Sequence, residues 1–191
     1  MTASKPFWEV NNSLIKDKAQ QLCHSNDPVS KKASSILEFV NTNLTYNNQK
    51  GFENRLGALG ALKNPTNAVC GEFADLFIAL ARACGIPARG LEGYVANSRQ
   101  LGDVLHMWAE YFDADQKMWI VVDPTWKQTD PNRLILAIHG LDSRSPLPAG
   151  AYKLDTDEKD QIIVNYGEEF AALSTAPSSY FDSLKHLLLF Q

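Results

Sequence analysis

Cysteine is scarce in this sequence, whose 191 residues include only Cys23, Cys70 and Cys84. The number is odd and no pair has C-x-x-C spacing, which argues against a disulfide framework and excludes a zinc ribbon. A chain of this length can bury roughly 70% of its unfolded surface, so its core needs no metal or disulfide. We therefore expect no disulfide framework.

Long apolar runs are also missing. No stretch of eighteen apolar residues occurs, so we expect no membrane span. Residues 1–14 lack a charged head followed by an apolar segment, so no secretory signal is visible. The formal charge of −4 argues against a nucleic-acid or anionic-membrane partner. The compartment stays open between the cytoplasm and the soluble part of an exported or anchored protein.

Metal-binding patterns are absent as well. The acidic stretches 113–117 and 155–160 begin like calcium loops but lack the required later glycine and glutamate. Cys70, Cys84 and His106 do not have the spacing of zinc ligands. We therefore expect no metal and no cofactor.

Apolar residues at helical spacing predict two main helices. The first stripe begins at residue 29, with Asp27 as a cap and Pro28 at the first helical position. The second is broader, starts at Cys70 and ends at Gly85. The segment 51–69 is rich in Gly, Asn and Pro, so we expect a loop with at most one helical turn.

Three strand-like runs follow at residues 88–97, 106–113 and 118–126, and a polar link makes the last two a hairpin. These elements predict an α+β fold with N-terminal helices packed on an antiparallel sheet. We expect one domain over residues 1–154. An extension over 155–191 would carry a candidate strand at 161–167 and a candidate amphipathic helix near 180–188.

Cys70, His106 and Asp123 occupy positions that suit thiol catalysis. Such catalysis needs a thiolate, an imidazole that takes and returns a proton, and a third group that holds the imidazole. Cys70 stands at a predicted helix start, where the positive end of the helix dipole favours the thiolate. His106 opens the second strand, and Asp123 lies near the end of the third.

The hairpin predicts that this histidine and aspartate are neighbours. If residue 113 pairs with residue 118, then 108 pairs with 123 and 106 pairs with 125. His106 and Asp123 are then diagonal neighbours on one face of the sheet, within reach of long side chains.

Each of the three residues has a plainer interpretation when it is taken alone. A cysteine flanked by apolar residues is usually part of the core, and we place Cys84 there. Cys23 is expected to be a helix-end residue without a role. His24, His139 and His186 have no comparable partners, so we expect them on the surface or in loops. The catalytic interpretation depends on the order of the three residues taken together.

The sequence around these residues resembles a known family. The blocks "VCGEFADLFIALARACGIPAR", "HMWAEYFD" and "WIVVDPTW" are similar, in the same order, to the three signature blocks of the transglutaminase-like superfamily. The resemblance covers about residues 28–130. It implies a papain-like α+β fold with Cys70 as nucleophile, His106 as general base and acid, and Asp123 as the orienting carboxylate. "CGEFA" also resembles the peptide:N-glycanases, whose usual paired zinc cysteines this sequence lacks.

Three further residues are candidates for contacts with substrate. An oxyanion hole needs hydrogen-bond donors near the developing negative charge. The backbone N–H of Cys70 is one candidate donor, and the resemblance to papain-like enzymes implies a second, the side chain of Asn64 six residues upstream. Trp108 and Trp126 flank the histidine and the aspartate, and they could exclude water or bind an acyl chain. Core or rim packing is the commoner role for such aromatics.

The expected activity is acyl transfer at an amide carbonyl, and the resemblance implies a protein or peptide substrate. Cys70 would form a thioester, which a lysine would resolve in crosslinking and water would resolve in deamidation or proteolysis. A non-catalytic protein-binding module that keeps the fold, and a peptide:N-glycanase-like amidase, are the alternatives. The oligomeric state stays open.

Overall fold

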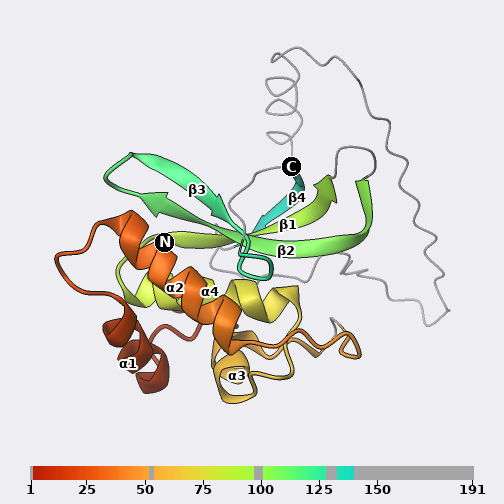
Figure 1. Cartoon of the computed structure of the whole chain (residues 1–191), viewed down its shortest axis with the longest axis horizontal. Coiled ribbons are helices and arrows are strands. Elements are labelled where there is room, and N and C mark those ends of the chain that lie inside the picture. Colours follow the sequence, from red (N-terminus) through yellow and green to blue (C-terminus); the bar gives the residue numbers. More distant parts are fainter. Residues whose placement is uncertain (1, 52–53, 97–100, 128–132, 140–191) are drawn as a thin grey trace, which may run out of the picture. The chain divides into compact units, whose positions relative to one another are not determined.

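The computed structural model describes residues 2–51, 54–96, 101–127 and 133–139 (Figure 1). The elements in these ranges are α1 (Ser13–Leu22), α2 (Val29–Asn43), α3 (Gly57–Lys63), α4 (Cys70–Ala83), β1 (Ala88–Ala96), β2 (Leu101–Asp113), β3 (Met118–Val122) and β4 (Arg133–His139). The strands form one antiparallel sheet in the order β3-β2-β1-β4. Figure 1 shows the helices on one side of this sheet, so the predicted α+β fold is confirmed.

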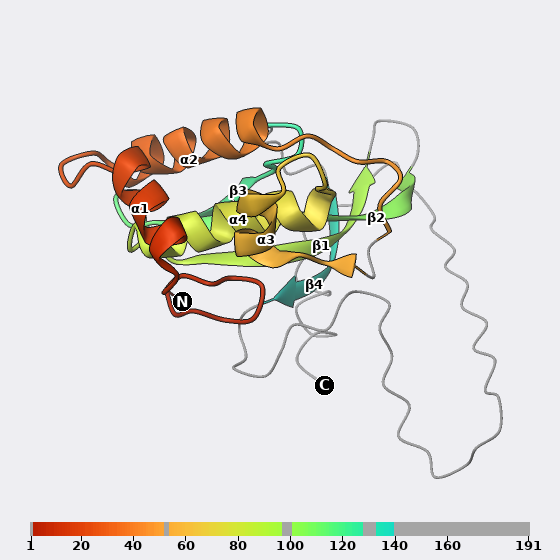
Figure 2. The same cartoon turned by 90° about the horizontal axis from the view of Figure 1, so that it is seen from below.

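Helix α4 forms the centre of the core. Every residue from Cys70 to Arg82 is buried, because β1 and β2 contact the helix on one side and α1, α2 and α3 contact it on the others (Figure 2). A helix that is surrounded in this way can be apolar on nearly all its faces. It ends before Gly85, whose φ of +79° is the left-handed conformation that favours glycine at a helix end. The predicted start of α4 at Cys70 is confirmed, and the helix ends at Ala83, two residues before the predicted end at Gly85.

The N-terminal helices differ in detail from the prediction. The N-cap of α2 is Pro28 rather than Asp27, and the Asp27 carboxylate instead accepts a hydrogen bond from Lys31 Nζ at 2.8 Å. Helix α1, which the analysis missed, begins after Asn12, whose side chain accepts the N–H of Leu14. Helix α3 spans 7 residues, so it is longer than the single turn that was predicted.

The β2–β3 hairpin has the predicted register. Asp113 pairs with Met118, and Ala109 pairs with Val122. The pairing was inferred by counting outward from the polar link between two strand-like runs, and the structure confirms this register.

The strand bounds change the positions of the two hairpin residues that matter for chemistry. Strand β2 begins at Leu101, so His106 lies inside the strand rather than at its start. Strand β3 ends at Val122, so Asp123 is the first residue after it. Strand β4 was not predicted, and it pairs with β1 at the edge of the sheet.

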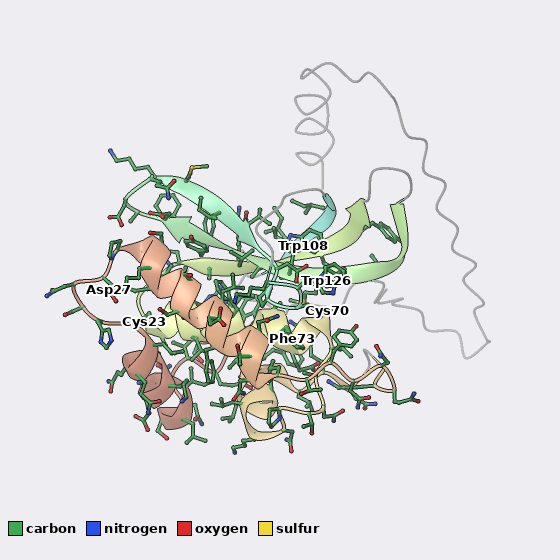
Figure 3. The ribbon with its side chains drawn as sticks, viewed as in Figure 1. Cys23, Asp27, Cys70, Phe73, Trp108 and Trp126 are labelled. Carbon is green, nitrogen blue, oxygen red and sulfur yellow. A yellow bond between two sulfur atoms is a disulfide. The ribbon has the colours of Figure 1, made fainter. Side chains whose placement is uncertain are left out.

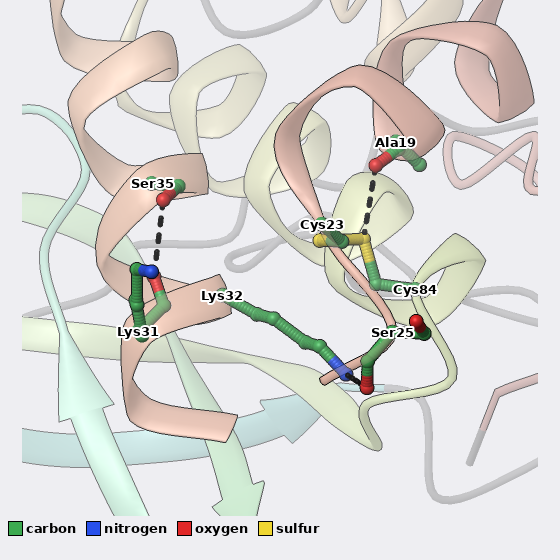
Figure 4. The surroundings of a disulfide bond; sticks show 7 residues. All are labelled: Ala19, Cys23, Ser25, Lys31, Lys32, Ser35 and Cys84. Carbon is green, nitrogen blue, oxygen red and sulfur yellow. Dashed lines mark hydrogen bonds between the residues drawn. A yellow bond between two sulfur atoms is a disulfide. The ribbon is translucent and has the colours of Figure 1, made fainter. Parts of the chain in front are cut away.

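Cys23 and Cys84 form a disulfide, so the expectations of a core position for Cys84 and of no role for Cys23 were wrong (Figure 4). Each follows the last residue of a helix, α1 and α4 respectively, and their Cα atoms are 6.2 Å apart. An odd cysteine count argues against a full framework but not against one bond with a thiol left over. Cys84 is therefore a bridging residue at the end of α4 rather than a core filler, and Cys23 has a structural role.

The predicted strand at 161–167, the predicted helix near 180–188 and the domain boundary at residue 154 lie outside the described residues. Within the described part of the chain, no helix has the length and apolar character needed to cross a membrane.

Candidate active site

The imidazole of His106 is held by a buried carboxylate. Its Nε2 lies 2.7 Å from Oδ2 of Asp123, and the two side chains are only 7% and 1% exposed. The other carboxylate oxygen accepts the backbone N–H of Thr125 at 2.9 Å, so both oxygens of Asp123 are engaged. With Nε2–H donated to the carboxylate, Nδ1 carries the lone pair that can accept a proton.

Two indole rings stack on this imidazole. The Trp126 ring is nearly parallel to it, with centroids 4.3 Å apart and an interplanar angle of 13°, and the Trp108 ring is 5.9 Å away. Trp126 is half exposed, whereas Trp108 is fully buried. Figure 3 shows both indoles in the same view as Cys70. Of the two predicted substrate contacts, Trp126 therefore has free surface for a substrate, and Trp108 packs inside the protein.

Cys70 is the one free cysteine among the described residues, and it is the first residue of α4. Burial raises the pKa of its thiol to about 11; the N–H groups of Met107 and Gly71 act against this rise, while the charges of Asp123 and Glu72 add to it. The helix start was expected to favour the thiolate, but burial of the thiol outweighs the effect of the helix dipole. The thiol is therefore neutral in the free protein, and a base must take its proton.

The structure brings the three predicted residues into one cluster. The backbone N–H of Met107, the residue next to His106 on β2, acts on the Cys70 thiol and lowers its pKa. The charge of Asp123 also acts on the Cys70 thiol. The Cys70 thiol at the start of α4 therefore lies on the side of β2 that carries the His106–Asp123 pair.

The start of α4 is fixed by the fully buried carboxylate of Glu72. Its Oε2 accepts the N–H of Val69 at 2.9 Å, in the manner of the third residue of a capping box. Its Oε1 accepts the N–H of Leu56 at 2.8 Å and lies 2.6 Å from Lys50 Nζ. One carboxylate therefore joins the residue before Cys70 to the segment that precedes α3.

A second buried carboxylate lies one turn further along α4. Asp75 accepts hydrogen bonds from Trp8 Nε1 at 2.7 Å and from Arg55 Nε at 2.8 Å. Burial raises the pKa of this carboxyl, and the Arg55 guanidinium acts against the rise. The segment before α3 thus supplies two cations, Lys50 and Arg55, to two carboxylates on successive turns of α4.

Tyr46 is a site residue that the sequence analysis missed. Its backbone bridges Ala68 in parallel, and its ring lies 6.2 Å from that of Phe73. Burial raises the pKa of the Tyr46 phenol, the charge of Cys70 raises it further, and a hydrogen bond from the Cys70 backbone N–H lowers it. The hydroxyl therefore lies at the N–H that was predicted as an oxyanion donor. Only the pairing of residues 46 and 68 places it there, and no sequence pattern signals that pairing.

The second predicted oxyanion donor is engaged elsewhere. Asn64 is the exposed residue that ends α3, and its Nδ2 donates to the carbonyl of Gly60 at 3.3 Å. An oxyanion role would require this amide to give up its helix-capping bond. Tyr46 is the better placed side chain for such a role.

The histidine expectations were partly wrong. His24 is exposed, as expected. His139 is only 8% exposed and lies on β4, with Nε2 2.7 Å from Oε2 of Glu92 on β1. Because β4 was not predicted, nothing in the sequence indicated that His139 lies beside Glu92 on the neighbouring strand. His186 lies outside the described residues.

The fold and the cluster together define a papain-like α+β protein with a buried thiol, imidazole and carboxylate. A family model for the transglutaminase-like superfamily matches residues 16–124. The chain therefore belongs to the transglutaminase-like superfamily, and the resemblance seen in the sequence is confirmed. No curated protein matches the chain.

Two solved structures are similar to this one. A protein from Cytophaga hutchinsonii, named as a candidate cysteine protease, is 22% identical with a TM-score of 0.61, over 72% of this chain and 45% of that chain. The periplasmic domain of TgpA from Pseudomonas aeruginosa is 21% identical with a TM-score of 0.49, over 66% of this chain and 49% of that one. This chain thus spans about half the length of either protein. The first similarity shows a shared fold.

Proposed function

We propose that this domain is a thiol enzyme that acts on amide bonds of proteins or peptides through a thioester on Cys70. The observation that carries the proposal is the buried pair of His106 and Asp123, which leaves Nδ1 of the imidazole to act as a base. The free thiol of Cys70 reaches the residue next to this imidazole. Membership of the superfamily and the fold shared with a candidate cysteine protease support the same proposal.

The raised thiol pKa determines the order of the proton transfers. At neutral pH Cys70 carries its proton, so His106 Nδ1 takes it as the sulfur attacks the carbonyl carbon. Asp123 stabilises the resulting imidazolium. His106 then returns the proton to the leaving ammonia or amine as the C–N bond breaks, which leaves the thioester. Water or a second amine attacks the thioester and releases Cys70.

The oxyanion formed during attack needs donors. The backbone N–H of Cys70 acts on the Tyr46 hydroxyl and lowers its pKa, so the two groups lie near each other. The phenol can then direct its own O–H to the same oxygen. Tyr46 and the Cys70 backbone would together form the oxyanion hole.

A non-catalytic protein-binding module is the alternative from another class. The specific observation that favours it is the burial of Cys70, which is 1% exposed with a pKa of about 11. A peptide:N-glycanase-like amidase would use the same three residues. Release of glycan from a denatured glycopeptide would identify it.

The proposal is tested by mass spectrometry of a glutamine-containing protein incubated with the enzyme and a primary amine. Amine addition indicates crosslinking chemistry, a one-dalton increase indicates deamidation, and shorter fragments indicate proteolysis. Cys70→Ala and His106→Ala should abolish the product, whereas His24→Ala, at an exposed histidine, should not. Product formation that survives Cys70→Ala, or no product from any amide or glycopeptide tried, would contradict the proposal.

A further inference from the structure

The five residues 123–127 hold both groups that act on the His106 imidazole. Asp123 hydrogen-bonds its Nε2, and Trp126 stacks on its ring. The peptide between them, at Pro124 and Thr125, belongs to neither a helix nor a strand. The position of this short segment therefore decides whether the carboxylate and the indole reach the imidazole.

The segment is held from α2 by the side chain of Asn41. Its Nδ2 donates to the carbonyl of Pro124 at 3.2 Å and to the carbonyl of Thr125 at 3.1 Å. The NH₂ group of an amide has two donors, so it can satisfy two adjacent carbonyls at once. Asn41 is half-buried, which shields both bonds from water.

A second contact from the same helix is weaker. Glu38, one turn before Asn41, pairs with Lys127 at the surface. Both side chains are about half exposed, and an ion pair of that kind contributes little. Of these two contacts from α2, Asn41 therefore makes the stronger attachment to the segment.

We propose that Asn41 is a positioning residue for the reaction, which rests on the proposed function. It fixes the carbonyls of residues 124 and 125, and through them it holds the Asp123 carboxylate and the Trp126 indole against His106. Removal of its amide would let the segment shift and would misplace both groups together. A displacement of about 1 Å can cost roughly a hundredfold in rate.

The first test needs no substrate. A protonated imidazole quenches the fluorescence of an indole stacked on it, so the emission of Trp126 should depend on pH through His106. The difference between the wild type and Trp126→Phe isolates this signal, and His106→Gln should remove it. Asn41→Ala should reduce its amplitude by at least half. Asn43→Ala is the matched control: Asn43 is an asparagine of the same helix that lines a surface groove, and its substitution should leave the amplitude unchanged.

The second test uses turnover. Asn41→Ala should lower kcat between about tenfold and a hundredfold and change KM little. In an Asp123→Asn background, Asn41→Ala should lower kcat much less, because the carboxylate that Asn41 positions is already lost. Asn41→Leu has about the same size without the N–H donors and without a charge, and it replaces Asn41→Ala if that variant fails to fold.

Two outcomes would overturn the proposal. One is a variant with a lowered Tm but an unchanged quenching amplitude, which would assign Asn41 a structural role only. The other is an additive effect of Asn41→Ala and Asp123→Asn on kcat. If the protein shows no amide turnover but Asn41→Ala still reduces the quenching, the two proposals separate. The proposed function is then contradicted, and the positioning role of Asn41 is supported.

Discussion

Lys50 Nζ lies 2.6 Å from Oε1 of Glu72, and the two side chains are only 4% and 0% exposed. The carboxylate belongs to the first turn of α4, and the lysine belongs to the segment that carries Tyr46. The ion pair therefore links the helix start that presents Cys70 to the residue whose hydroxyl lies beside it. Its energetics follow from the burial of both charges.

The first prediction concerns this pair. Lys50→Met leaves a buried, unpaired carboxylate and should lower the free energy of unfolding by about 3–5 kcal/mol. The double variant Lys50→Met/Glu72→Gln removes both charges and keeps one oxygen for the Val69 N–H, so it should be more stable than the single variant. Urea unfolding measures both values. If the effects of Lys50→Met and Glu72→Gln simply add in the double variant, the charges are not coupled.

The second prediction concerns the carboxylate on His106. Asp123→Asn should keep the fold but favour the wrong tautomer of the imidazole, and turnover should fall by about 10⁴-fold, as in other triads. Turnover and Tm are measured in parallel, with the exposed Asp17→Asn as control. Unchanged turnover at an unchanged Tm would remove Asp123 from the mechanism.

The third prediction concerns Tyr46. Tyr46→Phe keeps the ring against Phe73 but removes the hydroxyl at the Cys70 N–H. If the hydroxyl donates to the oxyanion, kcat should fall by about 10²–10³-fold. If it only covers the N–H in the free protein, kcat should stay the same or rise. Steady-state kinetics separate the two outcomes.

The sequence predicted the elements whose signals are local. The apolar stripe of α4 and the polar link of the hairpin were sufficient to place Cys70 at a helix start and to pair residue 113 with 118. That pairing was also sufficient to predict that His106 and Asp123 are neighbours.

The features that were missed depend on contacts between segments far apart in the chain. Tyr46 reaches the site through a bridge to Ala68, and Asn41 reaches it through carbonyls of residues 124 and 125. Neither contact leaves a pattern in the sequence. The burial of Cys70, which raises its pKa, likewise depends on the packing of α4 against β2.

The fourth prediction concerns the disulfide. Cys23 and Cys84 are 61 residues apart, and closing a loop of this size stabilises a fold by about 4 kcal/mol in the chain-entropy model. Cys23→Ser, or reduction of the wild type, should lower the free energy of unfolding by up to this amount. Thiol titration of the denatured, non-reduced protein should find one reactive cysteine. A count of three would contradict the bond.

The last prediction concerns the Cys70 thiol and its pH dependence. Burial raises its pKa from 9.0 to about 11, so the folded state holds the proton more tightly than the unfolded state does. This stabilisation is fully present below pH 9 and is lost as the pH rises toward 11. The unfolding free energy of the wild type should therefore fall more steeply across this range than that of Cys70→Ser. Because the variant lacks only the thiol, the difference between the two proteins removes the contribution of the other groups that titrate in this range. Alkylation of folded protein by iodoacetamide should be slow at neutral pH and should accelerate over the same interval, because the thiolate is the reactive form. Rapid labelling near pH 6, lost in His106→Ala, would show instead that an imidazolium holds the thiolate against the cost of its burial.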